Sequence, residues 1–467
     1  MRPAATSAFE TLAAEVDGPV YLPGTSEYAE EIDGFDRSVR HRPTVVVGAT
    51  SAADVVAAVR FARDNDLGVA VQNTGHGVAL PADKAVFIST RRMTGHEVDA
   101  RARTARIEAG VTWDDVVDSA AKHGLAPLNG SAPFVGATSY TLGGGVGVLA
   151  RKYGYAADHV RWLDVVTADG ELLRASESEH PDLFWALRGG KGNFGVVTAM
   201  AVELFEVSRL YGGGLFFPAE STPRVLHTYR EWVTGVPEDM STSFVMIPFP
   251  ELDFVPEPLR GKFATHIRVA YLGSAEEGAR LIQPLRDVGP RLLDTVEEMP
   301  YSKVGTIHND PPTAGSYYIN TFQLTGLEAG TVDTVLELAG PDADGTVMVE
   351  IRQLGGALAR PPKVPNAVAH RDDVPFQVYA ASVLGNGQDD VVLTAHARLV
   401  DRLSRWDSGH RMLNFMAGIA HTDPSDVRDA FTDEAYTRLV ALKTRYDPGN
   451  MFRFNHNIPP APGKQRR

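Results

Sequence analysis

Residues 44–77 read TVVVGATSAADVVAAVRFARDNDLGVAVQNTGHG, and this stretch decides the fold of the first part of the chain. Its β-branched start is typical of a buried strand. Ser51 and Asp54 have the spacing of a helix capping box, and Gly68 stands where a C-terminal capping glycine belongs. A second apolar run follows at 69–71. Strand, helix and strand in so short a stretch predict a βαβ unit with two parallel strands.

The rest of the first 200 residues continues as an α+β unit. Thr112 with Asp115 three residues later predicts a second capped helix, and Gly124 stands at its expected end. Asp169 and Gly170 lie between two apolar runs and form the sequence of a tight hairpin turn.

The composition changes in the middle of the chain. We expect the glycine-rich stretch 212–217 and the proline-rich stretch 248–259 to be loops that open a second domain. Alternating segments at 346–351 and 376–380 predict strands of an antiparallel sheet, and helix returns at 433–444. Because no low-complexity linker separates the parts, the sequence favours a second domain inserted into the first or packed closely on it.

Length and composition exclude several classes of protein. The chain has 467 residues, which predicts two or three domains, and 45 Lys and Arg against 59 Asp and Glu give a formal charge of −14. This acidic balance argues against nucleic-acid binding. No apolar run reaches the length of a bilayer span and the first residues lack a signal-peptide pattern, so we expect a soluble, cytoplasmic protein.

Missing residue types and motifs exclude further chemistry. The absence of cysteine excludes disulfides, thiolate catalysis, Cys-ligated zinc and iron–sulfur clusters. The chain also lacks H-E-x-x-H, a strand followed by G-x-G-x-x-G, a P-loop and G-x-S-x-G. The strongest evidence for a zinc protease, a Rossmann dehydrogenase, a P-loop NTPase or an α/β-hydrolase is therefore missing, and no metal site is predicted.

Three loops are dense in glycine: 72–77, 143–147 and 188–195. A loop that leaves the carboxyl end of a parallel strand is where such sheets bind ligands, and glycines let phosphates approach backbone N–H groups. Each loop alone is more often an ordinary turn, but three in one domain favour a ligand site. His76 alone would be a polar loop residue, and Tyr379 alone a core aromatic.

Four segments in order carry a resemblance to a known family: 42–76, 135–160, 182–198 and 446–460. In them the chain resembles the berberine bridge enzyme-like FAD-linked oxidases of the vanillyl-alcohol oxidase superfamily, especially their bacterial members. The resemblance covers nearly the whole chain. It implies a two-domain α+β flavoprotein. The FAD-binding domain would comprise residues 1–206, completed by 412–467, and the substrate domain would comprise 207–411, built on a large antiparallel sheet.

The resemblance implies FAD as the cofactor, held by one covalent bond through His76. The family's loop before this histidine holds the FAD pyrophosphate, although Gln72 and Asn73 depart from its usual Arg-Ser. Ala132 stands where many relatives have a cysteine, so a second covalent bond is excluded. The cofactor-binding residues that the resemblance implies are Gln72, Asn73, Thr74, Gly75, His76, Gly77, Gly136, Ser139, Tyr140, Gly143, Gly144, Gly145, Gly147, Asn193, Phe194, Gly195, Val197, Asn455 and Asn457.

Two further positions bear on reactivity. Val135 matches the family's oxygen-access residue, and a valine there resembles the oxygen-reactive members, which favours an oxidase over a dehydrogenase. A plain packing role for Val135 is the competing interpretation. Lys191 replaces a usual glycine, and the resemblance gives no account of it.

The catalytic base is the residue that the resemblance defines least. Plant members use a glutamate at the position of Ala381, and Tyr379 points to the same strand face two residues earlier, which makes it the candidate base. Met412 replaces another tyrosine of many relatives. Tyr140 would lie near the flavin pyrimidine edge and donate a hydrogen bond to the charge of reduced flavin. A phenol with a pKa near 10 is a poor base at neutral pH unless its surroundings lower that value.

We therefore expect an oxidase that moves a hydride from a small molecule, by family resemblance a secondary-metabolite precursor, to FAD. Its partners would be this substrate and dioxygen, without nucleic acid or membrane, in a monomer or homodimer. One alternative is a non-redox cyclase, an isomerase or lyase that uses bound FAD as a scaffold. The missing glutamate and Met412 favour it. A flavin-binding protein without catalysis is the other alternative, and His76 argues against it.

Overall fold

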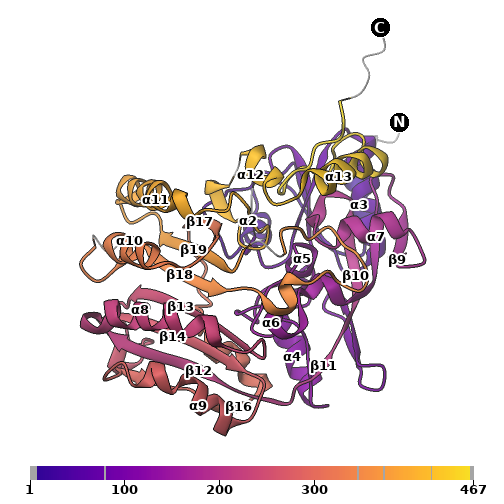
Figure 1. The fold of residues 1–467 in the computed structure, drawn as a ribbon. Helices are drawn as coiled ribbons and strands as arrows, with labels where there is room; N and C mark the ends of the chain where they lie inside the picture. The colour runs from indigo at the N-terminus through magenta and orange to yellow at the C-terminus, as the bar shows by residue number, and fades with distance from the viewer. Residues whose placement is uncertain (1–7, 78–79, 344–346, 372–373, 422, 463–467) are drawn as a thin grey trace, which may run out of the picture.

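The computed structural model describes residues 8–77, 80–343, 347–371, 374–421 and 423–462. Its first part contains a four-stranded and a five-stranded sheet and lies at the right of Figure 1, while an eight-stranded sheet lies at the left. The α+β class with a large antiparallel sheet agrees with the expectation from the sequence. In the described ranges no helix is both long and apolar enough to cross a membrane.

The four-stranded sheet contains the predicted βαβ unit. Its order is β1-β2-β4-β3, with bounds Val20–Tyr21, Val45–Gly48, Ala85–Ser89 and Gly68–Gln72. Helix α3 (Ala52–Asp64) joins β2 to β3, and the Ser51 side chain caps it by accepting a hydrogen bond from the Asp54 N–H. Strands β2 and β3 are parallel as expected, but β4 lies between them and pairs with both.

The expected capping role of Gly68 is wrong. Asp66 takes the left-handed conformation after α3, with φ 54°, and Gly68 begins β3. A Cβ at Gly68 would lie 2.6 Å from the Phe454 ring. A side chain at this position would therefore have to displace a segment nearly 400 residues later that packs against it.

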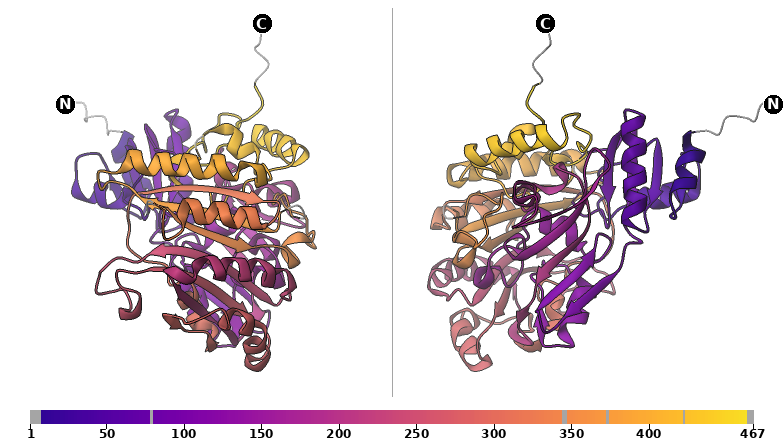
Figure 2. Two further views of the ribbon diagram at one scale, coloured as in Figure 1. Left: turned by 60° about the vertical axis from the view of Figure 1, so that its left-hand side comes forward. Right: turned by 90° about the vertical axis from the view of Figure 1, so that its right-hand side faces the viewer.

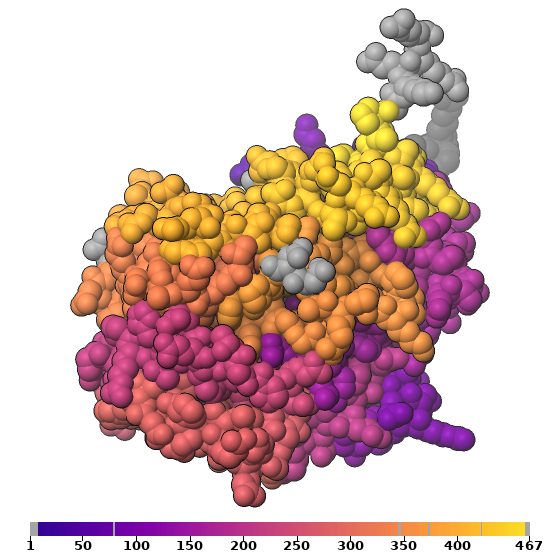
Figure 3. Space-filling view, viewed as in Figure 1, coloured from indigo at the N-terminus to yellow at the C-terminus, as the bar shows by residue number. Residues whose placement is uncertain are grey.

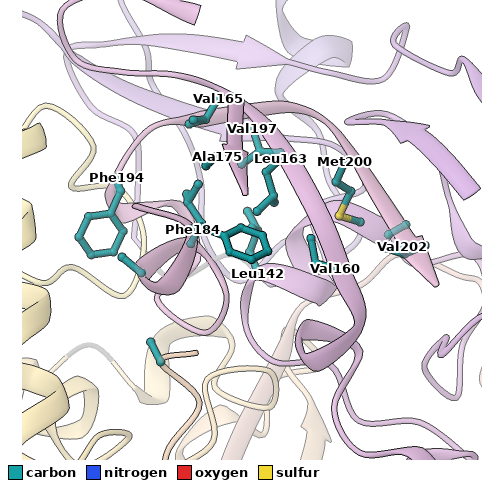
Figure 4. Packing of buried hydrophobic residues seen from close by; sticks show 14 of the residues in the cluster. Leu142, Val160, Leu163, Val165, Ala175, Phe184, Phe194, Val197, Met200 and Val202 are labelled. Atoms are coloured by element: carbon teal, nitrogen blue, oxygen red, sulfur yellow. The ribbon is translucent and has the colours of Figure 1, made fainter. Parts of the chain in front are cut away.

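The five-stranded sheet is antiparallel and has the order β5-β6-β10-β8-β9. Its strands are His96–Asp99, Thr104–Glu108, Val196–Glu203, Val160–Val166 and Leu172–Ser176. The predicted hairpin joins β8 to β9, with Gly170 at φ 73°. Figure 4 shows its core, where Leu163 of β8 and Met200 of β10 pack near Phe184 of α7 (Pro181–Leu187).

The remaining elements of the first part are short. Helix α4 (Trp113–Ala121) has the expected capping box of Thr112 and Asp115. Strand β7 (Leu125–Ala126) pairs with β11 (Phe205–Glu206). The other helices are α1 (Ala8–Glu15), α2 (Ser26–Ile32), α5 (Ala137–Leu142), α6 (Ala150–Tyr153) and the 3₁₀ turns η1 (Ala156–His159) and η2 (Lys191–Asn193).

The eight-stranded sheet is antiparallel, in the order β15-β12-β14-β13-β18-β19-β17, with β16 also paired to β12. From β12 to β19 the bounds are Arg209–Pro218, Met240–Pro248, Phe263–Tyr271, Leu293–Asp294, Glu297–Pro300, Tyr317–Leu324, Met348–Gln353 and Phe376–Val383. The glycine-rich stretch 212–217 is therefore not a loop, because it lies inside β12. The strands expected at 346–351 and 376–380 are β18 and β19, although residue 346 lies outside the described residues.

The two faces of this sheet differ in chemistry. Leu215, Phe244 and Ile351 lie on the outer face, in one buried apolar cluster with residues of four helices. These helices are α8 (Thr222–Trp232), α9 (Ala275–Arg286), α10 (Ala329–Ala339) and α11 (Asp389–Leu403), and Figure 1 shows them on the left and lower side. Since side chains alternate along a strand, the neighbouring residues point to the opposite face. The other 3₁₀ turns are η3 (Ala219–Ser221), η4 (Val233–Gly235), η5 (Glu257–Leu259), η6 (Tyr301–Ile307), η7 (Gly356–Ala359), η8 (Ser404–Trp406) and η9 (Gly418–Ala420).

After the large sheet the chain returns to the first part. Helices α12 (Pro424–Arg428) and α13 (Asp433–Tyr446) follow, and α13 lies beside α7 (Figure 1). This C-terminal part, in yellow, lies at the top of Figures 2 and 3. The buried Lys443 Nζ lies 2.7 Å from the Asp447 carboxylate and donates to the Asn193 carbonyl at 2.8 Å. Because Asp447 also accepts the Phe452 N–H, this ion pair fixes the C-terminal segment against the first part. The domain boundaries expected near 206 and 411 stay predictions.

Candidate active site

A long cavity lies between the loops of the first part and the C-terminal segment. Its enclosed volume is about 160 Å³, and the space at its mouth is open to solvent. The predicted cofactor residues that line it are Gln72, Asn73, Thr74, Gly75, His76, Gly77, Gly136, Ser139, Gly195, Val197 and Asn455.

Backbone geometry holds the loop after β3 in one shape. Gly75 has φ 76°, and a Cβ there would lie 2.7 Å from Gly34 Cα, so only glycine fits. The Gln72 side chain donates to two carbonyls at the end of α2 instead of pointing freely into the cavity. Thr74 Oγ1 accepts a hydrogen bond from the Gly136 N–H at 3.4 Å. This hydrogen bond joins the loop to the start of α5, and both segments line the same cavity.

His76 is held in an aromatic environment at one side of this cavity. Its ring stacks on Phe35 with centroids 3.9 Å apart, and the Phe134 ring lies 5.4 Å away. Nδ1 lies 2.8 Å from Thr74 Oγ1, whereas Nε2 is buried and has no hydrogen-bond partner. Burial lowers the pKa of His76 to about 4, although the Asp310 carboxylate opposes this shift. The imidazole is therefore neutral at pH 7 and has one nitrogen available.

Other buried polar atoms around the cavity also lack partners. They are Asn73 Nδ2, Thr138 Oγ1, Asn455 Oδ1 and His456 Nε2. A buried polar group without a hydrogen bond costs free energy, and such groups gather where a ligand supplies the partner. The set contains both donors and acceptors, which fits a cofactor with phosphates, hydroxyls and ring nitrogens such as FAD.

Several predicted cofactor residues do not line the long cavity. Phe194 is fully buried in the core, and Asn193 bonds the carbonyls of Gly190 and His456. Asn457 does not line the cavity either, and its buried Oδ1 has no partner. These side chains do not form the cavity wall but lie behind it. There Asn193 joins its loop to the C-terminal segment.

The glycine cluster at 143–147 also lies beside the cavity and not on its wall. The Gly145 N–H donates to Asn414 Oδ1 at 2.7 Å, and Gly144 has φ 114°. A Cβ at Gly147 would lie 1.8 Å from the Asn129 carbonyl oxygen. Close backbone packing therefore accounts for Gly144, Gly145 and Gly147, while direct contact with a cofactor stays a prediction.

Val135 and Ala132 occupy one turn before α5. Val135 is half-buried and lines the cavity, and its N–H donates to the Ala132 carbonyl at 3.1 Å. Its own carbonyl accepts the Trp113 N–H at 3.1 Å. The backbone of Val135 is thus fixed by packing, and its side chain remains free to act at the cavity wall.

The inner face of the eight-stranded sheet is polar. Strand register places its side chains in two adjacent rows. One row contains Arg268, Ser243, Arg352 and Gln377, and the next contains His266, Glu350, Tyr379 and Thr321. A second, much smaller hollow of about 20 Å³ lies between this face and residues 146–151. Such a face, opposite the glycine-rich loops, is suited to bind a polar small molecule.

A buried charge cluster dominates this face. Glu350 Oε1 lies 3.1 Å from a nitrogen of Arg268 and 3.1 Å from one of Arg352. Burial alone would raise the pKa of Glu350, but Arg352, Arg268 and His308 together hold it well below its usual value. Burial and Arg268 lower the pKa of His308 to about 4, so this ring is neutral. In the part of the chain that the structure describes, no group of three His, Asp or Glu could hold a metal ion.

Sequence reasoning missed this cluster. The available signal was a charged residue at every second position of an expected strand, since Glu350 and Arg352 flank the apolar Ile351. Such an alternation identifies the polar face of a sheet but not what the face meets.

Tyr379 lies on the inner face, but its surroundings argue against the expected role as a base. Burial raises the pKa of its hydroxyl far above the ordinary value of 10, and the carboxylates of Asp310 and Glu350 raise it further. A phenolate there would be desolvated beside negative charges. The chemistry that this environment supports is hydrogen-bond donation by the neutral hydroxyl.

Tyr140 does not line the long cavity. Its ring meets Trp113 edge-on at 5.7 Å, and its buried hydroxyl has no partner. Burial raises its pKa far above 10, so acid–base catalysis by Tyr140 is disfavoured as well. Its hydroxyl, which has no partner, can still donate a hydrogen bond. The expected contact with the flavin edge stays a prediction.

Asp310 is a second residue that the sequence did not indicate. Its carboxylate lies 3.8 Å from Arg268 and acts on the pKa values of both His76 and Tyr379. Its charge thus acts both on the polar face and on the loop that carries His76. Its side chain is 31% exposed, so water reaches the carboxylate.

Comparison with known proteins finds two family models in the chain. A model described as "FAD binding domain" matches residues 43–176, and one described as "Berberine and berberine like" matches residues 421–459. The first matches the region of the glycine loops up to residue 176, and the second includes the C-terminal wall of the cavity.

Full-length relatives give the same result. The chain is 30% identical over 462 residues to (R)-6-hydroxynicotine oxidase of Paenarthrobacter nicotinovorans, covering 95% of this chain and 97% of that protein. It is 24% identical over 494 residues to chitooligosaccharide oxidase of Gibberella zeae, covering 98% and 96%. The crystal structure of 6-hydroxy-D-nicotine oxidase from Arthrobacter nicotinovorans matches with a TM-score of 0.83 at 27% identity, over 97% of this chain and 99% of that one.

Proposed function

Because the chain belongs to the berberine bridge enzyme-like family of FAD-linked oxidases, we propose that it oxidises a polar small molecule at a C–OH or C–N bond, or by oxidative ring closure. The observation that carries this proposal is the cavity lined by His76 and by four further residues whose buried polar atoms have no partner. FAD bound there supplies the hydride acceptor and, with dioxygen, the route to hydrogen peroxide. The protein supplies binding, orientation and proton transfer.

We propose that His76 forms the single covalent bond to the cofactor, through Nε2. Nδ1 is engaged with Thr74, and Nε2 is buried without a partner. The low pKa of His76 keeps the ring neutral, which a nitrogen nucleophile requires. Stacking on Phe35 fixes the plane of the ring.

On the substrate side we propose that Arg268 and Arg352 orient polar groups of the substrate. Two guanidinium groups share the one carboxylate of Glu350, so donor N–H groups remain for a ligand. The neutral Tyr379 hydroxyl donates a further hydrogen bond. We assign proton removal to Asp310, because it is a partly exposed carboxylate beside both Tyr379 and the His76 loop.

Reoxidation by dioxygen is supported by Val135. It presents a small side chain at the cavity wall, in the position that the family resemblance links to oxygen access. Two electrons and two protons then leave the active site as hydrogen peroxide. That the substrate belongs to secondary metabolism, and that the protein works in the cytoplasm, are proposals from the family and from composition.

A non-redox cyclase is the second candidate. It is favoured by Ala381 and Met412, which replace family side chains, and by the high pKa of Tyr379. Anaerobic mixing of holoenzyme with candidate substrates separates the two. The oxidase loses its flavin absorbance near 450 nm and, in air, forms one hydrogen peroxide per product. Product formation without bleaching would establish the cyclase and overturn the oxidase proposal.

A further inference from the structure

Lys191 occupies a backbone position that is unfavourable for a lysine. It lies in η2 between two glycines and has φ 53°, in the left-handed region that glycine adopts without cost. A glycine there would relieve this strain. The chain nevertheless carries a long, charged side chain, so the side chain itself needs an explanation.

The side chain extends along the wall of the long cavity. A Cβ at Gly143 would lie 3.1 Å from Lys191 Cε, so the glycine leaves room for the lysine stem. The ammonium lies 3.8 Å from the position of a Cβ at Gly77, directly after His76. Lys191 therefore reaches the same loop that the family resemblance associates with the FAD pyrophosphate.

This ammonium has no counter-charge of its own. Among the described residues no carboxylate lies within 4.0 Å of Nζ. Burial lowers the pKa of Lys191 to about 8, and no charged side chain opposes that shift. At neutral pH the group is mostly protonated, so the site carries an uncompensated positive charge.

The contact between Lys191 and His456 shows which of their nitrogen atoms donate and which accept. Nζ lies 3.2 Å from His456 Nδ1, and a protonated lysine can only donate, so Nδ1 accepts and the ring proton is on Nε2. His456 is 2% exposed, and its Nε2 has no partner. Burial, Lys191 and His421 keep the pKa of His456 well below its usual value, so the ring stays neutral.

The pair thus presents only N–H donors and one positive charge to the cavity. A ligand that satisfies it must offer an acceptor with negative charge. In oxidised FAD the formal negative charges are on the diphosphate, and the flavin ring is neutral. In the oxidised cofactor, therefore, only the diphosphate can balance this cation.

We propose that Lys191 and His456 form an anion-binding pair for the diphosphate of FAD. The inference rests on FAD binding and adds to it two side chains with a stated role. Neither residue is part of the proposed proton transfer, and the backbone of His456 is already held by Asn193.

The experiment measures flavin affinity in a His76→Ala background, where no covalent bond retains the cofactor. FAD and riboflavin, which lacks phosphate, are titrated by flavin fluorescence into His76→Ala and into His76→Ala with Lys191→Met. A charge-assisted phosphate contact corresponds to roughly a 10- to 100-fold loss of FAD affinity, with riboflavin affinity unchanged within about twofold. Inorganic pyrophosphate should compete with FAD in the parent and about tenfold less well in the Lys191 variant.

Control variants distinguish the loss of the Lys191 charge from a change in the fold. Lys191→Gly removes the charge and the backbone strain together and should lose FAD affinity as Lys191→Met does. Lys84→Gly replaces an exposed lysine that also has a positive φ, 52°, outside the cavity, and should change nothing. The flavin content of purified Lys191→Met with His76 intact gives a second measure and should fall below that of the wild type.

Equal affinity of both Lys191 variants for FAD, or equal losses for FAD and riboflavin, would overturn the proposal. So would a changed midpoint potential with unchanged affinity for oxidised FAD, because that result would place the cation at the flavin ring. Failure of wild-type protein to carry flavin would instead contradict the proposed function itself. The two failures are therefore distinguishable.

Discussion

The assignment of proton removal can be tested by comparing Asp310→Asn with Tyr379→Phe. Tyr379→Phe deletes only a hydroxyl whose pKa is raised by burial and by three carboxylates. If this group donates one neutral hydrogen bond, its loss is worth about 0.5–1.5 kcal/mol, or roughly 2- to 13-fold in rate. If Asp310 is the base, Asp310→Asn costs about 10² to 10⁴ in rate, as loss of a positioned base does.

The assay is anaerobic stopped-flow reduction of the flavin by substrate, followed from pH 6 to 9. Without oxygen the assay measures only flavin reduction, so changes in oxygen access do not affect the measured rate. Because the pKa of Tyr379 is raised above 10, its ionisation gives no pH dependence in this range. Tyr318→Phe is the matched control, since Tyr318 lies on β17 and packs edge-on against His396 of α11.

A loss of more than about 100-fold in Tyr379→Phe, with a wild-type rate that still rises steadily at pH 9, would refute this reasoning. Tyr379 would then be the base in spite of its surroundings. A near-normal rate in Asp310→Asn would exclude the carboxylate. If neither change matters, the substrate loses its proton to water, and the non-redox cyclase gains support.

Three further predictions concern the cofactor, oxygen and pH. After acid precipitation the yellow colour should stay with wild-type protein and leave His76→Ala, and free flavin in the wild-type supernatant would contradict a covalent bond. Val135→Ile should slow reoxidation by oxygen, because the larger side chain narrows the cavity at this wall, while flavin reduction stays nearly unchanged; equal slowing of both would indicate a packing defect. His308 and His396 each have a pKa of about 4 in the folded protein, below the unfolded value near 6.5. Since the unfolded chain binds more protons between these values, stability should fall as pH drops from 7 to 5, by about 1–2 kcal/mol per histidine, and His396→Gln should flatten the fall in denaturant melts.

Local patterns in the sequence were sufficient for the elements of the first part. The spacing of Ser51 and Asp54 fixed the start of α3, and Thr112 with Asp115 fixed the start of α4, because a capping box involves only neighbours in sequence. Asp169-Gly170 likewise identified the hairpin between β8 and β9. The ordered motifs also indicated the family and its cofactor, because a bound ligand requires particular residues at particular positions of a loop.

Patterns failed where a distant segment decides the local structure. Gly68 has the spacing of a helix cap, but a side chain near the C-terminus occupies the space where its Cβ would be. The glycines of 212–217 have the composition of a loop, but they lie in β12, where two strands from later in the chain pair with them. In both cases contacts with segments distant in the sequence outweigh local propensity.

The site shows the same division between sequence and tertiary structure. The sequence by itself predicted, through the family resemblance, that His76, Val135 and the glycine loops belong to a flavin site, because these residues lie within single motifs. Only the tertiary structure brought Asp310 and the Arg268 cluster to face them, and only it placed Lys191 against His456, 265 residues later. Charge and burial depend on what surrounds a side chain in space, so the acidity of Tyr379 and the neutrality of His76 could not be obtained from their neighbours along the chain.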